Sequence, residues 1–502
     1  METKDGFKPV IILDPGKRFR LNKTRIEFTD AQPSTELAET LQANVRKMDG
    51  EFAIPANVIQ KETELVQRLR KDGYPFASAG DRKIMGDRKA GELEVTYQIS
   101  SGPRVRFGKV VFPDNVKTKH TYLSRLIPFK QGEVYSPEKM STFGSRLDET
   151  RLFSLANAHL SDTPSGQHES GDEIRDIEVT LTERKKNRIE AGINLATDTG
   201  FGLSTEFTRR NLSRRGDFLV AGFNISTYEQ SLDIKWRRPN EFGYGKNLTF
   251  GSSLSNEDTD AYNRQIFTLS SEFENRKNPR RTYGFGVKGS LISEQDEFSE
   301  RDLQLVSLYA KAGLDRANSV LNATKGWRAD GRIEPSLSFG GDETQFIRGS
   351  AQLRGYLPLR EDHGVVLAGR LRIGSVWGAE LEDLPTTSRF FSGGGGSVRG
   401  YAYQDIGPLS ANNEPIGGKS LLETSIEARW MIRPKISLAG FVDAGNVSTR
   451  DVPGVSDMRA GAGFGVRYDT LAGPLRIDIA TPLDPTDRDD PVQVYISLGQ
   501  AF

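Results

Sequence analysis

The chain of 502 residues contains no cysteine. It therefore has no disulfide framework, no thiolate metal site and no cysteine nucleophile. Its 68 Lys and Arg residues balance 68 Asp and Glu residues, which argues against a surface built to coat nucleic acid or an anionic membrane. No run reaches the ~18 to 20 apolar residues of a membrane-spanning helix. The mean hydropathy of −0.52 is typical of a soluble protein, but a membrane β-barrel alternates apolar with polar residues and escapes that test.

The start of the chain has the pattern of an incomplete protein. Met1 is not followed by a basic and then apolar signal segment. Residues 10–13 (Val-Ile-Ile-Leu) precede Asp-Pro-Gly, which predicts one strand that ends in a turn and has no partner before it. We expect residues 1–14 to be the last strand of a preceding domain, whose beginning is absent together with any signal peptide.

Two similar units follow this strand. The first has a predicted helix over residues 58–70, which ends before Gly73, a plausible C-cap. The order strand, helix, helix, strand, strand then recurs, and Ser136 caps the second helix of the repeat. We therefore expect two tandem α+β domains, at residues 15–101 and 102–183.

From about residue 185 the helical period disappears, and apolar residues alternate with polar ones. Residues 475–479 (Leu-Arg-Ile-Asp-Ile) are one example. About 16 such segments follow one another, each close to the ~9 to 11 residues that a membrane-crossing strand needs. Full charges stand at strand centres on the polar face, and no helix remains to cover the apolar face, which disfavours a β-sandwich or a propeller. We predict an all-β, 16-stranded antiparallel transmembrane barrel over residues 184–502.

One predicted connection, residues 378–419, is much longer than the others, and loops of this length are usually functional. Its glycine run at residues 393–396 is not a phosphate loop, because no strand–loop–helix unit surrounds it. A Gly-x-Ser-x-Gly elbow is missing from the sequence. The histidines are scattered without ligand spacing: His120, His159, His168 and His363. We expect no catalytic residue, no metal site and no cofactor.

The same loop carries a single arginine within a short motif. The motif consists of Val398, Arg399, Gly400 and Tyr401. The strand period turns Asp443 and Glu427 toward the lumen of the predicted barrel. A loop tucked into this lumen could pair Arg399 with these carboxylates, and a desolvated bidentate pair would anchor it.

These residues resemble a known superfamily. Residues 398–401 (Val-Arg-Gly-Tyr) resemble the loop signature of the superfamily that includes BamA, TamA and the FhaC-type secretion transporters. Residues 441–445 (Phe-Val-Asp-Ala-Gly) are similar to its Phe-x-Asp-x-Gly strand motif. The two α+β units resemble its POTRA (polypeptide-transport-associated) domains. The longer runs at residues 389–394 and 106–112 are most similar to the TamA-like branch.

The resemblance implies an N-terminally incomplete, TamA-like outer-membrane subunit of the translocation and assembly module, which is not an enzyme. Its POTRA domains would lie in the periplasm. It would help insert or secrete β-barrel and autotransporter clients, with unfolded client proteins, outer-membrane lipid and a TamB-like periplasm-spanning protein as partners. We expect no nucleic acid partner. The POTRA domain that would face the TamB-like protein is expected to be missing. Arg399 would lock the loop onto Asp443 and Glu427.

The implied mechanism uses the barrel seam, where the first strand meets the last. Gly192 and Gly499 would weaken this seam, which ends at Phe502. An open seam offers an unpaired edge to which a client strand can add, and POTRA sheets have such edges too. The competing interpretation is that the two glycines only relieve crowding where the sheet curves.

Three other functions remain open from the sequence. A two-partner secretion pore of the same superfamily would export a dedicated soluble substrate and would normally carry a plug helix. A passive porin would conduct through its polar lumen, but the two preceding α+β units disfavour it. An enzymatic barrel is the weakest alternative, because no set of serine, histidine and carboxylate can be assembled near one strand end.

Overall fold

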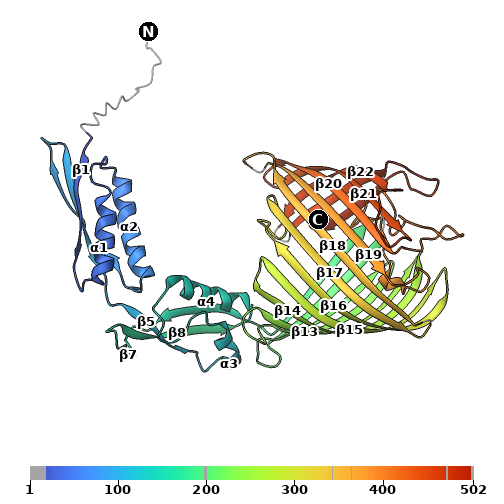
Figure 1. Cartoon of the computed structure of the whole chain (residues 1–502), viewed down its shortest axis with the longest axis horizontal. Coiled ribbons are helices and arrows are strands. Elements are labelled where there is room, and N and C mark those ends of the chain that lie inside the picture. Colours follow the sequence, from blue (N-terminus) through green and yellow to red (C-terminus); the bar gives the residue numbers. More distant parts are fainter. Residues whose placement is uncertain (1–17, 197–199, 342, 363, 471–472, 499–502) are drawn as a thin grey trace, which may run out of the picture. The chain divides into compact units, whose positions relative to one another are not determined.

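The computed structural model divides into two compact units, one ending at Arg184 and the other beginning at Lys185. It describes residues 18–196, 200–341, 343–362, 364–470 and 473–498 (Figure 1). The strand expected within residues 1–14 lies outside this described part. Within it, no helix is both long and apolar enough to cross a membrane.

The first unit begins with an α+β domain. Its elements are β1 (Arg20–Phe28), α1 (Thr35–Arg46), α2 (Pro55–Lys71), β2 (Ser78–Ala79), β3 (Lys83–Asp87) and β4 (Glu92–Ser100). The central strand β4 pairs in parallel with β1 and antiparallel with β2 and β3. The parallel pairing is possible because both helices lie in the crossover between β1 and β4.

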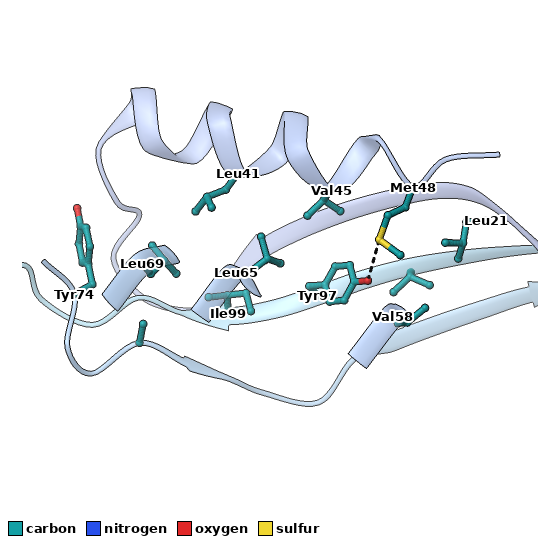
Figure 2. Packing of buried hydrophobic residues seen from close by; sticks show 12 residues of the cluster. Leu21, Leu41, Val45, Met48, Val58, Leu65, Leu69, Tyr74, Tyr97 and Ile99 are labelled. Atoms are coloured by element: carbon teal, nitrogen blue, oxygen red, sulfur yellow. Dashed lines mark hydrogen bonds between the residues drawn. The ribbon is translucent and has the colours of Figure 1, made fainter. Parts of the chain in front are cut away.

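One hydrophobic core joins the two helices to the sheet (Figure 2). Tyr97 of β4 is fully buried, and its hydroxyl donates to Sδ of Met48 at 3.7 Å. Leu65 and Leu69 of α2 face this core, as expected for residues four positions apart on a helix. The predicted end of the helix is confirmed, since Gly73 follows α2 with a φ of +99°, which glycine adopts at little cost.

The second α+β domain repeats the same order. Its elements are β5 (Val105–Val111), α3 (His120–Leu123), η1 (Ser124–Leu126), α4 (Pro137–Glu149), β6 (Phe153–Leu160), β7 (Gly166–Gln167) and β8 (Glu173–Glu183). Strand β8 pairs in parallel with β5 and antiparallel with β6 and β7. The predicted cap of α4 is confirmed, because the Lys139 N–H donates to Oγ of Ser136 at 3.3 Å.

The second unit is a closed antiparallel barrel of 16 strands, which confirms the predicted fold class (Figure 1). The strands are β9 (Asn187–Ala196), β10 (Gly200–Arg210), β11 (Phe218–Ser226), β12 (Glu229–Arg238), β13 (Lys246–Thr259), β14 (Tyr262–Asn278), β15 (Arg281–Asp296), β16 (Glu300–Asp315), β17 (Gly326–Phe339), β18 (Thr344–Pro358), β19 (Val365–Trp377), β20 (Ser420–Arg433), β21 (Ile436–Ser448), β22 (Arg459–Thr470), β23 (Gly473–Pro482) and β24 (Gln493–Leu498). Each strand pairs with the next along the chain, and β24 closes the barrel on β9.

The two faces of the barrel differ in the way that the alternation predicts. In β20, Ile426 is 58% exposed on the outer face, while the next residue, Glu427, is fully buried inside. In β21, Val442 is 50% exposed and Asp443 only 1%. A barrel that separates lipid from a polar lumen needs an apolar outer face and a polar or charged inner face.

The first α+β domain should depend on its core leucines. Leu69→Ala removes a fully buried side chain and should lower the free energy of local unfolding by about 2–5 kcal/mol. Amide hydrogen exchange of α2 in the full chain measures this change. Ile59→Ala, on the same helix but 49% exposed, is the matched control and should change exchange little. Equal effects of the two substitutions would contradict the described core.

Candidate functional site

The predicted long connection joins the end of β19 to the start of β20 and covers residues 378–419. We call this segment the lumen loop. Its one helical element is a short 3-10 helix, η2 (Thr386–Ser388). Val398, Arg399 and Tyr401 are nevertheless at most 1% exposed. Such burial is unusual in a loop, because its backbone polar groups need partners. Inward-facing side chains of the barrel supply such partners. Arg370 donates to the carbonyls of Gly396 and Ser397, and Arg348 donates to the carbonyl of Ser388.

Arg399 makes the densest set of contacts in the lumen loop. Its Nε donates to Oδ2 of Asp443 at 2.6 Å and its Nη2 to Oδ1 of the same carboxylate at 3.0 Å. The backbone N–H of Arg399 also donates to Asp443, at 3.2 Å. Its Nη1 donates to Glu427 at 2.9 Å and to Asp478 at 3.0 Å. One guanidinium therefore ties the loop to three strands, β20, β21 and β23.

Three arginines of the wall share the same carboxylates. Arg429 donates to Glu427 at 2.7 Å, and Arg467 donates to Glu427 at 3.1 Å and to Asp478. Arg476 lies 3.4 Å from Asp478. We call the whole set the arginine–carboxylate network: Arg399, Arg429, Arg467, Arg476, Glu427, Asp443 and Asp478. Four guanidinium groups face three carboxylates, so the buried network has a formal charge of about +1 when all are ionised.

Aromatic packing and small residues let Arg399 come this close to the wall. Its guanidinium carbon lies 3.3 Å from the ring centre of Phe441, within the range of a cation–π contact. A Cβ atom at Gly461 of β22 would overlap the carbonyl oxygen of Arg399. Gly400 has a φ of +105°, which favours glycine at this turn.

A second charged contact fastens the first part of the lumen loop. The hydroxyl of Thr386 donates to Glu294 of β15 at 2.6 Å, and Nη2 of Arg389 donates to Asp296 at 2.6 Å. Arg301 of β16 lies 3.0 Å from Glu294. Charged contacts with β15 and β16 thus hold the lumen loop in addition to those with β20–β23.

The other motif residues are fixed by packing and by neutral hydrogen bonds. Val398, Tyr401 and Ile406 form a buried apolar cluster. The Tyr401 hydroxyl donates to the carbonyl of Ala460 at 2.9 Å, and the Gly400 N–H donates to the hydroxyl of Tyr495 at 3.0 Å. The motif therefore contacts β24, the last strand of the barrel, as well as β20–β23.

The structure brings together Arg399, Asp443 and Glu427, the three residues that the sequence analysis expected to pair. Asp478 and Tyr495 also contact the motif, and the sequence did not predict them as its partners. A signal for Asp478 was present, because the alternation over residues 475–479 turns it inward with the other polar residues of β23. For Tyr495 the sequence offered no signal, since its role depends on which loop backbone atoms reach the last strand.

The predicted seam residues are only partly described. Gly192 of β9 is paired with Ser204 of β10. Gly499 and Phe502 lie outside the described residues. Within the described part, β24 and β9 are joined by the pairs Tyr495–Ala196 and Ile496–Leu195.

The lumen loop should lose its anchor when Arg399 is removed. Arg399→Ala leaves Asp443 and Glu427 buried without their loop partner, and breaking a buried ion pair in this way costs about 3–5 kcal/mol. We expect the barrel still to insert into the membrane but the loop to become sensitive to protease. Arg399→Lys should give an intermediate result, because a point charge cannot make the bidentate contact.

Protease cleavage within residues 378–419 of the membrane-inserted protein measures this effect. Arg360→Ala is the matched control, since Arg360 is an exposed arginine that pairs with Asp362 in another connection. Unchanged protease resistance of Arg399→Ala would show that the ion pairs do not hold the loop.

The chain is similar to several known proteins. The outer membrane protein assembly factor BamA of Nitratidesulfovibrio vulgaris is 25% identical over 526 residues, which cover 99% of this chain and 64% of that protein. The chain thus spans less than two thirds of the length of this relative. The crystal structure of BamA from Haemophilus ducreyi lacking POTRA domains 1-3 has a TM-score of 0.79 at 19% identity and covers 95% of this chain and 99% of its own. CdiB from Acinetobacter baumannii has a TM-score of 0.52 at 15% identity, with 99% and 93% covered.

Both solved structures are similar in fold to nearly the whole of this chain. The barrel and the relatives confirm the predicted location in the bacterial outer membrane, with the α+β domains in the periplasm. The family model of the Omp85 superfamily domain matches residues 211–502, more than half of the chain. The chain belongs to the Omp85 superfamily.

Proposed function

We propose that this protein is an outer-membrane assembly factor that helps insert or secrete β-barrel and autotransporter clients. The BamA relative, which is named as an assembly factor, supports this activity. In this proposal residues 15–101 and 102–183 are POTRA domains, and residues 184–502 form the barrel. Unfolded client proteins would bind by β-augmentation to the exposed strand edges of the POTRA domains and would enter the membrane at the barrel seam.

The joint between the last and first strands is the observation that carries the proposal. In the described residues, β24 has six residues and meets β9 in two register pairs. Each backbone hydrogen bond contributes only about 0.5–1.5 kcal/mol net. The bonds of the two described pairs are therefore individually weak, and we propose that the barrel opens at this joint and exposes strand edges for β-augmentation.

The lumen loop has a supporting role in this proposal. Arg399, held by Asp443 and Glu427, would keep the loop folded in the lumen while the wall changes shape. Val398, Gly400 and Tyr401 would set the path of the loop backbone past the seam. We expect Arg399→Ala to impair client assembly for this reason, in addition to exposing the loop to protease.

The narrower proposal is a TamA-like role within the superfamily. The runs at residues 389–394 and 106–112 support it by their similarity to that branch. A TamA-like subunit would act with a TamB-like periplasm-spanning protein. Co-purification of a TamB-like protein with the full-length protein from its native membrane would support this role, and its failure in a preparation that still inserts clients would favour a general assembly factor.

The second candidate function is a two-partner secretion transporter. The similarity to the CdiB structure, with a TM-score of 0.52, supports this second candidate. Such a transporter would export one soluble substrate through the lumen and would not insert barrels. Depletion of the protein separates the two functions: we expect client barrels to be lost from the outer membrane. Loss of one secreted protein with barrels unaffected would support the transporter instead.

A disulfide across the seam should test the assembly mechanism. Because the chain has no cysteine, Leu195→Cys with Ile496→Cys would create one defined bond between β9 and β24, at a described register pair. We expect insertion of client barrels to stop under oxidising conditions and to return with reductant. The measurement is the yield of folded client in proteoliposomes.

The matched control uses the same Ile496→Cys with Ile477→Cys, which joins β24 to β23 at another register pair. This bond ties strands that have no need to separate, so insertion should continue. Normal insertion with the seam pair fully oxidised would rule out seam opening as the mechanism.

A further inference from the structure

Tyr495 lies on the last strand of the barrel and contacts the lumen loop. Its side chain is 1% exposed. The hydroxyl accepts a hydrogen bond from the Gly400 N–H at 3.0 Å and donates one to the carbonyl of Tyr401 at 3.2 Å. Both partners are backbone groups of the motif at residues 398–401. One phenol oxygen therefore uses its donor and an acceptor position on the same turn of the loop.

The ring of Tyr495 is enclosed as well. It packs in an apolar cluster with Phe441 and Ala480, and Phe441 is the ring that carries the Arg399 guanidinium. On the loop side, a Cβ atom at Gly395 would come within 2.7 Å of the Tyr495 ring. The close approach of the loop backbone fixes the orientation of the ring, and the ring orientation aims the hydroxyl at the motif.

The same residue belongs to the seam. Its register partner on β9 is Ala196, and its partner on β23 is Asp478. Asp478 is the carboxylate that accepts from Arg399 at 3.0 Å. Tyr495 is therefore at a position where the seam, the motif backbone and the arginine–carboxylate network are direct neighbours.

We propose that the Tyr495 hydroxyl is a latch that couples the lumen loop to the last strand. While its two hydrogen bonds are made, the anchored loop holds β24 in the barrel wall. When they break, β24 loses its hydrogen bonds to the anchored loop and the seam opens more readily. Tyr495 is a positioning residue that acts through the loop backbone. The proposed function gives the opening its use, but the latch itself is a property of the barrel.

Tyr495→Phe in the full chain tests the latch, because it removes the hydroxyl and keeps the ring. We expect amide hydrogen exchange in β9 and β24 to become about tenfold faster, as for the loss of two neutral hydrogen bonds. Exchange in β20 and β21, next to the Arg399 anchor, should not change. The matched control is Tyr309→Phe, which removes a buried lumen hydroxyl that donates to Glu272 at 3.0 Å, away from the seam. It should leave seam exchange unchanged.

A double-mutant cycle with Arg399→Ala separates the latch from simple packing of β24. If the hydroxyl acts through the anchored loop, Tyr495→Phe should add little once Arg399→Ala has released that loop. An equal acceleration in both backgrounds would overturn the coupling. Unchanged seam exchange in Tyr495→Phe, or the same acceleration in Tyr309→Phe, would also overturn it.

The readout is made without any client, so the two proposals can fail separately. Unchanged seam exchange in Tyr495→Phe, in a protein that inserts clients, overturns the latch and leaves the proposed function standing. Accelerated exchange in a protein that inserts no client supports the latch and counts against the proposed function.

Discussion

A guanidinium group buried inside a membrane barrel is the constraint on which the rest of the second unit depends. Taking such a charge out of water costs several kcal/mol, and Arg399 is 1% exposed. The cost is offset because Asp443 binds the guanidinium in a bidentate contact, and Glu427 and Asp478 accept its remaining hydrogen bonds. The partners come from three different strands. A loop residue can find all three only if the lumen loop enters the barrel, so the buried charge determines the path of the whole segment.

The carboxylates depend on the arginines in turn. Glu427 and Asp478 are fully buried and would be strongly destabilising without the cations of the neighbouring strands. Strand geometry supplies those cations, because residues two apart point to the same side. Arg429 thus shares the inner face with Glu427, and Arg476 shares it with Asp478. The alternation that gives the barrel its lipid-facing surface also assembles the ionic interior.

The sequence was sufficient to predict the strands, the inward direction of Asp443 and Glu427 and the long loop, since all three follow from a period of two and from connection length. It was not sufficient to predict Asp478 or Tyr495 as partners of the loop. The two-residue alternation along a strand shows that a side chain points inward. The register between strands decides which inward side chains become neighbours. Register depends on the tilt and stagger of the whole barrel. The second anchor, Arg389 on Asp296, was missed for the same reason.

The strengths of the contacts decide what moves if the seam opens. Breaking the buried ion pairs of Arg399 costs about 3–5 kcal/mol, whereas each neutral hydrogen bond of Tyr495 contributes about 0.5–1.5 kcal/mol net. The two contacts lie side by side, so any force that separates the loop from the last strand acts on both. The weaker contact yields first. If the seam opens as proposed, the lumen loop is therefore expected to stay with β20–β23, and its hydrogen bonds to Tyr495 of β24 are expected to break first.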